Sequence, residues 1–144
     1  MEITETVALI RLGVSLLLGA AIGIERKIHR HPAGARTFMI ICLGATLATL
    51  TSIYICQTNP DLHNGDPGRI AAQILTGIGF IGAGLILKTQ DGVSGLTTAT
   101  CIFMAAAIGV AVGVGMLRVA AVVTLVVLGI LWTPYLSGKK DGDE

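Results

Sequence analysis

Hydrophobic residues along this chain are gathered into five long runs, and short polar segments separate them. The runs predict helices over residues 6–24, 37–55, 66–87, 96–115 and 119–136. Runs of about 18 to 20 apolar residues are long enough to cross the hydrocarbon core of a bilayer. The pattern therefore predicts an all-α membrane protein, a bundle of five transmembrane helices.

The third run, residues 66–87, is the helix around which we expect the bundle to be organised. Asp66 can cap its first turn, and Pro67 suits the first helical position. At about 100° per residue, isoleucines and leucines share one face and polar or small side chains share the other. The second face holds Asp66, Arg69, Gln73, Thr76, Gly77 and Gly84. Because lipid offers polar groups no hydrogen bonds, we expect this face to point into the bundle and only the aliphatic flank to meet lipid.

The same run contains Gly77, Gly79 and Gly82, which match the G-x-G-x-x-G fingerprint of dinucleotide-binding loops. That motif works only after a strand and at the start of a helix. Here it lies inside a long apolar run, so we interpret these glycines and Gly84 as helix-packing residues. Gly19 and Gly23, and Gly109 and Gly113, are spaced to allow similar close helix contacts.

Charge sets the expected orientation. One set of alternate loops holds seven basic residues, and the other holds two, or three with Arg11. The first set is Arg26, Lys27, Arg30, Arg36, Lys88, Lys139 and Lys140. The positive side is cytoplasmic, which predicts an N-terminus outside and a cytoplasmic C-terminus. Trp132 and Tyr135 near the end of the last run suit a membrane interface.

Composition supports a membrane domain over residues 1–137 with a short charged tail over residues 138–144. Of the 144 residues 53% are hydrophobic and 13% are charged, whereas soluble domains carry about 25% charged residues. The net charge of +1 argues against a nucleic-acid partner. The first run lacks the basic flank and cleavage site of a signal peptide. Cys42, Cys56 and Cys101 form no C-x-x-C pair, so we expect them to be small packing residues.

Two polar constellations could carry function. Glu25 and Arg36 flank the basic loop after the first helix, where they could form a structural latch, a gate or a partner contact. Asp66, Arg69 and Gln73 share one face, where they could cap and pair locally or form a polar vestibule for an ion, lipid headgroup or partner.

Magnesium is the obvious ion to consider, because it prefers an octahedral shell of oxygens. Apart from Asp66 at the start of the third run, no Asp or Glu lies within an apolar run, and the available side-chain oxygens are those of Gln73, Thr76, Thr97, Thr98 and Thr100. A magnesium path would therefore need backbone carbonyls or a symmetric oligomer. We predict no metal site, no cofactor and no catalytic residue, since the three histidines lie in loops and no nucleophile has a base nearby.

Five ordered motifs resemble those of the MgtC/SapB family of bacterial inner-membrane proteins. They are G-x3-GIER from Gly19, AGART from Ala33, D-x2-RIAAQ from Asp66, GIGFIGAG from Gly77 and GLTTA from Gly95. The resemblance implies a five-helix membrane domain with a role under low magnesium. Members were first named magnesium transport proteins, and the resemblance favours regulation of other membrane proteins, including the F-type ATP synthase. Many members continue into a soluble ACT-like domain, which the given sequence would lack, and Lys27 stands where the family often has an acidic residue.

The preferred hypothesis is a membrane regulator that binds another membrane protein or a second copy of itself in the lipid bilayer. The alternative is a transporter or channel for Mg²⁺ or another small solute, lined by the polar face of residues 66–87 in an oligomer.

Overall fold

The computed structural model describes residues 3–58, 66, 68–90 and 92–136. The described residues form five helices and one short hairpin. These are α1 (Glu5–Ile28), α2 (Ala35–Thr58), α3 (Gly68–Ala83), β1 (Leu87–Thr89), β2 (Gly92–Ser94), α4 (Leu96–Val114) and α5 (Leu117–Leu136). The mostly helical architecture predicted from the sequence is confirmed. The predicted tail at residues 138–144 and the predicted helix start at Pro67 lie outside the described residues.

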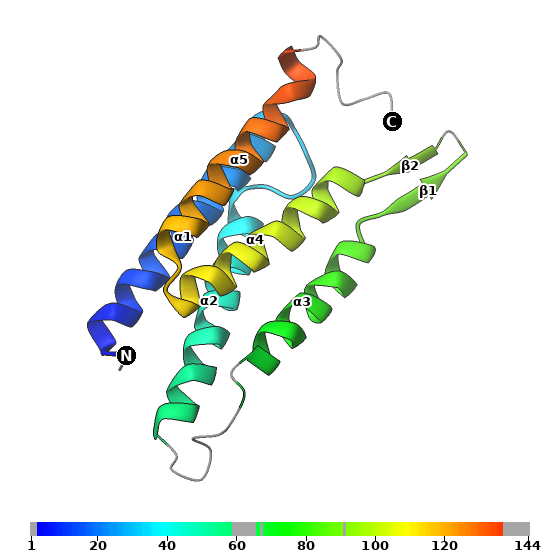
Figure 1. Cartoon of the computed structure of the whole chain (residues 1–144). Coiled ribbons are helices and arrows are strands. Elements are labelled where there is room, and N and C mark those ends of the chain that lie inside the picture. The colour runs from blue at the N-terminus through cyan, green and yellow to red at the C-terminus, as the bar shows by residue number, and fades with distance from the viewer. Residues whose placement is uncertain (1–2, 59–65, 67, 91, 137–144) are drawn as a thin grey trace.

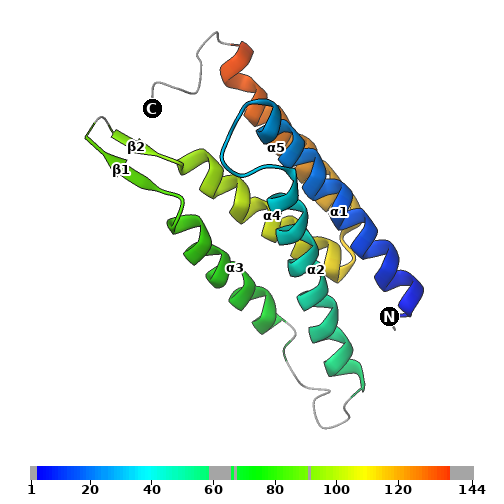
Figure 2. The ribbon, with the colours of Figure 1, turned by 180° about the vertical axis from the view of Figure 1, so that it is seen from behind.

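Successive helices run in opposite directions, so the fold is an up-and-down bundle (Figure 1). The centre is formed by α1, α2 and α4, with α5 packed on α1 and α4. Ile22, Phe38 and Ile102 are fully buried there. The view from behind shows α3 at one edge of the bundle beside α4 (Figure 2).

Glycines allow the central helices to approach closely. A Cβ atom added at Gly19 of α1 would lie 2.7 Å from the carbonyl oxygen of Phe38 in α2, and one at Gly113 of α4 would lie 2.6 Å from Cβ of Thr49. Gly23 and Gly109 face α2 in the same way. Backbone contact of this kind suits helices in lipid, where packing rather than the hydrophobic effect drives association.

The third helix is shorter than predicted. It ends at Ala83, and the N–H groups of Leu85 and Ile86 donate to the carbonyls of Gly82 and Ala83 in a tightening turn. The chain then forms an antiparallel hairpin in which Leu87 pairs with Ser94. Leu87 therefore belongs to a strand and not to the helix.

The expectation that the third helix lies at the centre, with its polar face inward, is wrong. Among the residues of α3 only Gly82 is buried, and Ile78 packs against the core. Gln73 and Thr76 are exposed, and Phe80 is 84% exposed. The aliphatic face of α3 points inward because it packs on α4. The centre of the bundle is occupied by α1, α2 and α4, whose glycines permit closer contact.

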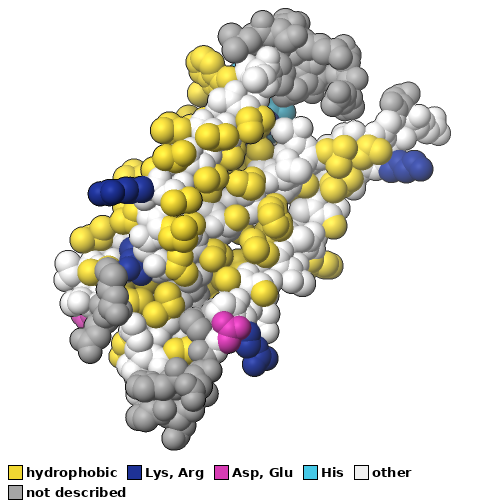
Figure 3. Space-filling model, in the orientation of Figure 1, with side chains coloured by type: hydrophobic (Ala, Val, Ile, Leu, Met, Phe, Trp, Pro, Cys, Tyr) yellow, Lys and Arg dark blue, Asp and Glu magenta, His cyan; other side chains and the backbone are white. Residues whose placement is uncertain are grey.

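Three helices, α1, α2 and α4, are long and apolar enough to span a membrane, and Gly68–Ala83 and Leu117–Thr133 are shorter apolar helices. Hydrophobic side chains spread over the middle of the face shown in Figure 3, and charged side chains lie mainly near its edges. This surface is the kind that lipid covers.

Candidate functional site

A charged cluster lies at the end of α1. The helix continues one turn beyond its predicted end, which places Glu25 and Arg26 inside it, 6% and 0% exposed. Arg26 donates from Nε to Oε2 of Glu25 at 2.5 Å and from Nη2 to Oε1 at 2.8 Å. This two-pronged geometry is the strongest form of an arginine–carboxylate pair. Because the two charges neutralise each other, the pair can be buried where either charge alone would be costly.

His29 completes the cluster. Its Nδ1 lies 2.9 Å from the backbone carbonyl oxygen of Glu25 and 3.0 Å from the Oε1 atom of the same residue. The imidazole therefore lies over the last turn of α1, beside the Glu25 carbonyl, which also accepts the backbone N–H of His29 at 3.3 Å. The three side chains form one connected polar unit.

The predicted latch between Glu25 and Arg36 is wrong. Glu25 pairs with Arg26 and His29, and Arg36 is exposed in the first turn of α2. Neighbouring residues of a helix point about 100° apart, so sequence reasoning does not favour a pair at adjacent positions. Arg26 is therefore a functional candidate that the sequence reasoning missed, and its place in the G-x3-GIER motif, directly after Glu25, is the signal that could have identified it.

The turn after α1 holds this cluster in place. The N–H of His31 donates to the carbonyl of Arg26, and the N–H of Arg30 donates to that of Lys27. This is the Schellman pattern, which places one residue in the left-handed region. That residue is Arg30, with φ of 61°, although glycine is the usual occupant. The turn directs the chain back into α2.

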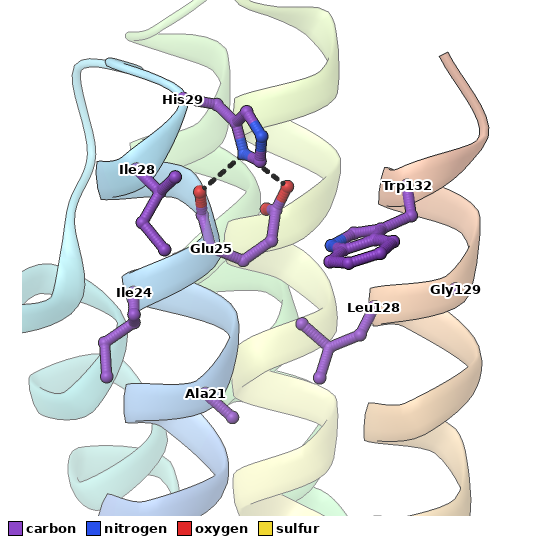
Figure 4. Close-up of a pocket in the computed structure, with 8 residues that line it drawn as sticks. All are labelled: Ala21, Ile24, Glu25, Ile28, His29, Leu128, Gly129 and Trp132. Carbon is purple, nitrogen blue, oxygen red and sulfur yellow. Dashed lines mark hydrogen bonds and ion pairs between the residues drawn. The ribbon is translucent and has the colours of Figure 1, made fainter. Parts of the chain in front are cut away.

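A cavity of about 650 Å³ opens between α1 and α5 beside the cluster. Its apolar lining consists of Ala21, Ile24 and Ile28 from α1 and Leu128, Gly129 and Trp132 from α5, and its polar lining is Glu25 and His29. Figure 4 shows the imidazole above the carboxylate, with the indole of Trp132 across the opening. Sequence reasoning does not predict this pairing of α1 with α5, because hydrophobic patterning does not specify which helices are neighbours.

Arg11 occupies the other end of α1. It is 5% exposed and donates from Nη1 to the carbonyl oxygen of Gly113 at 2.7 Å. Gly115, which follows α4 with φ of 96°, leaves room for the guanidinium, since an added Cβ would lie 2.8 Å from Nη2 of Arg11. A cation at the carbonyl end of a helix is also favoured by the helix dipole. Arg11 thus faces the interior of the bundle.

The second predicted constellation, formed by Asp66, Arg69 and Gln73, lies along α3 at the edge of the bundle. Oδ1 of Asp66 accepts a hydrogen bond of 2.8 Å from the N–H of Gly68, as expected of a capping residue. Within the described part of the chain Asp66 and Arg69 form no ion pair. Arg69, Gln73 and Thr76 are exposed on α3, and the hydroxyl of Thr76 donates to the carbonyl of Ala72.

The threonines expected to supply oxygens to the same path lie elsewhere. Thr97 is exposed and Thr98 is buried in the first turn of α4. That turn lies at the opposite end of the bundle from the start of α3 (Figure 1). The structure therefore does not bring Thr97 and Thr98 together with Gln73 within one chain.

The glycines of α3 have different surroundings. A Cβ added at Gly82 would make ordinary contact with Ala99, whereas one at Gly77 or Gly79 would meet nothing within 4 Å. Gly84 lies at the end of the helix, next to the carbonyl of Ile81. The open side of this helix is therefore lined by Gly77 together with Gln73, Thr76 and Phe80.

Among the described residues no group of three or more His, Cys, Asp or Glu side chains could hold a metal ion. Within the same residues, Cys42, Cys56 and Cys101 form no disulfide.

Comparison with known proteins gives one family. A sequence model described as the MgtC family matches residues 12–135. The protein SapB of Bacillus subtilis is 37% identical over 140 residues, which are 94% of this chain and 60% of SapB. MgtC of Salmonella typhimurium is 42% identical over 120 residues, 83% of this chain and 49% of MgtC.

YhiD of Escherichia coli, whose name proposes magnesium transport, is 44% identical over 125 residues, 83% of this chain and 58% of YhiD. The chain thus spans about half to three fifths of the length of these relatives. No solved structure matches it.

Proposed function

This chain belongs to the MgtC family, and from that membership we propose that it is a bacterial inner-membrane protein that regulates another membrane protein in magnesium homeostasis. Membership in this family implies a magnesium-related role.

We propose that all five helices cross the membrane, with the N-terminus outside. The alternating directions of the five helices support this topology (Figure 1). Lys27, Arg30 and Lys88 are exposed at one end of the bundle, the arrangement expected of a cytoplasmic side. The shorter helices α3 and α5 would match the bilayer by local thinning or by contact with neighbours.

The observation that carries the proposal is the open face of α3. Gln73, Thr76, Gly77 and Phe80 lie on the outer side of an edge helix, where a single chain would expose them to lipid. Polar and small residues on a membrane helix are favoured where another helix covers them, because lipid offers neither hydrogen bonds nor a close fit. This face is therefore suited to bind a helix of another membrane protein.

The F-type ATP synthase, which the family resemblance implies, is the first candidate partner. A second copy of this chain is the other. Asp66 and Arg69 are exposed at the start of α3 and do not pair with each other, so both charges can reach a partner of complementary charge.

Transport is the alternative, and the same face supports it. If several copies met along α3, Gln73 and Thr76 would line the shared axis and supply side-chain oxygens to an ion that keeps part of its water shell. The backbones of α1, α2 and α4 approach one another closely at the centre of the bundle. This close packing favours a passage between chains over a passage through one chain.

Reconstitution separates these functions. The purified chain is placed in liposomes that contain a magnesium indicator, with folding and orientation verified. The regulator predicts no flux above that of protein-free liposomes. Robust flux in the unmodified chain that is lost in Gln73→Leu would replace the regulator with the transporter.

A further inference from the structure

The cavity between α1 and α5 takes no part in the proposed contact of α3, which lies on the far side of α4 (Figure 1). It is held open by small residues. Gly129 leaves a gap in the wall of α5, since an added Cβ would meet nothing within 4 Å. Ala21 faces it from α1. The volume of about 650 Å³ is within the range of ligand-binding pockets, about 300 to 1,000 Å³.

The cavity opens on the outer surface of the bundle. Ile24, Ile28 and Trp132 on its rim are 51%, 69% and 59% exposed. Leu125 of α5, one turn before Gly129, is 69% exposed on the same helix. A surface of this composition meets acyl chains, so the occupant arrives from the bilayer rather than from water.

The polarity of the cavity changes along its length. Ala21 and Ile24 line the part that lies deeper along α1, and Glu25, Ile28 and His29 line the part at the helix end. In Figure 4 the indole nitrogen of Trp132 lies on the side of the ring that faces α1. The apolar and polar ends are thus arranged along the helix axis in the same order as the tail and headgroup of a lipid.

The charge at the polar end favours an anionic headgroup. Glu25 is neutralised by Arg26, so its carboxylate does not dominate the local field. Lys27 in the last turn of α1 and Arg30 just after the helix are exposed, and basic residues next to a membrane segment attract anionic lipids. The Trp132 indole N–H can donate a hydrogen bond to a phosphate, and Nε2 of His29 can donate a second one when the imidazole is protonated.

We propose that this cavity is a binding site for an anionic phospholipid, with one acyl chain between α1 and α5 and the phosphate beside His29 and Trp132. The lipid links the end of α1 to α5 and covers the buried Glu25–Arg26 pair. The proposal requires a membrane-embedded chain but does not depend on the regulatory role.

Trp132 reports on the site directly because it is the only tryptophan of the chain. The chain is reconstituted in phosphatidylcholine vesicles that contain a minor fraction of phosphatidylglycerol with brominated acyl chains, or the same fraction of brominated phosphatidylcholine. Bromine quenches a nearby indole. We expect stronger quenching by the anionic lipid, equivalent to a preference of about fivefold.

Filling the cavity provides the decisive variant. Gly129→Leu places a side chain in the empty space without meeting another residue at its Cβ, and we expect it to abolish the preference. Gly13→Leu is the matched control, because Gly13 is also a helical glycine with nothing within 4 Å but does not line the cavity. It should keep the preference. Native mass spectrometry of the same proteins counts the retained lipid independently of the indole.

Equal quenching by the two lipids in the unmodified chain would overturn the proposal, and would be the result if a partner helix filled the cavity. A preference that survives in folded Gly129→Leu would also overturn it, since the attraction would then come from the basic turn alone. If circular dichroism shows that Gly129→Leu is unfolded, Ala21→Leu fills the site from the other wall. His29→Ala, which keeps the cavity open, should weaken the preference.

Discussion

Arg11 and Gly113 are 102 positions apart in the chain, yet the guanidinium of Arg11 donates a 2.7 Å hydrogen bond to the carbonyl oxygen of Gly113. The bond joins the first helix to the end of the fourth. It satisfies a carbonyl that helix α4 cannot satisfy itself, and it gives a buried cation a partner.

Arg11→Met should therefore destabilise the bundle. We expect a loss of about 2 kcal/mol, since hydrogen bonds to charged groups are worth about 1.5 to 3 kcal/mol. Thermal unfolding in detergent measures it. Arg118→Met is the control, because Arg118 is exposed in the first turn of α5. Equal unfolding temperatures for the two variants would show that the bond to Gly113 does not contribute.

The Glu25–Arg26 pair should behave as one unit. Glu25→Ala leaves Arg26 buried without its carboxylate, and breaking such a pair costs about 3 to 5 kcal/mol. Arg26→Ala in the same chain should restore part of the loss, because no unpaired charge remains. Arg36→Ala should not restore it, since Arg36 is exposed and does not contact Glu25. Additive effects of the Glu25 and Arg26 changes on unfolding temperature would exclude the coupling.

Arg30→Gly should stabilise the chain. Arg30 has φ of 61°, a conformation that costs an L-residue about 1 to 2 kcal/mol and that glycine adopts readily. We expect a higher unfolding temperature by differential scanning calorimetry. Arg30→Ala keeps the backbone strain while it removes the charge, so a gain of the same size in that variant would point to charge instead of conformation.

The glycine contacts of α4 should be sensitive to a single methyl group. Gly113→Ala places a Cβ 2.6 Å from Cβ of Thr49, whereas Gly44→Ala meets nothing within 4 Å. The first change should separate α4 from α2 and lower stability by about 1 to 3 kcal/mol. The second should be neutral or slightly stabilising because alanine is the better helix former. Similar denaturant midpoints for both would contradict close packing at Gly113.

Gln73→Leu should leave the stability of the isolated chain unchanged, since the side chain is exposed. In native membranes it should weaken binding of the partner, because a helix that covers α3 loses a hydrogen bond at that position. Co-purification with the F-type ATP synthase, or with a differently tagged second copy, checks the second effect. A lower unfolding temperature in detergent would mean that Gln73 supports the fold rather than a contact.

The boundaries of the helices along the chain could be predicted from the sequence more closely than the packing of one helix against another. The predicted start at residue 96 is that of α4, and its predicted end at 115 lies one residue beyond Val114. Gly95 before this helix and Gly115 after it both have positive φ. The same reasoning placed α3 at the centre because it assumed that polar residues point inward. Core and lipid are both apolar, so hydrophobicity does not tell the inner face of a membrane helix from the outer one.

The candidate site shows the same limit. Glu25 could be identified as a charge at a helix end, but its partner could not, because Arg26 lies next to it in sequence and a one-turn extension of the helix buries both. The cavity depends on Gly129 of α5 lying opposite Ala21 of α1. Pairing of two helices that are about 100 residues apart has no local sequence signal.

Site-specific photo-crosslinking in native bacterial membranes would show directly whether α3 contacts another protein. A photoreactive residue at position 80 lies on the open face of α3, and one at position 122 lies on the exposed surface of α5, where Val122 is 59% exposed. The regulator predicts that position 80 captures an identified membrane protein, either a subunit of the F-type ATP synthase or a second copy of this chain, and that position 122 captures lipid. Capture of lipid alone at both positions would contradict the claim that α3 is a contact surface.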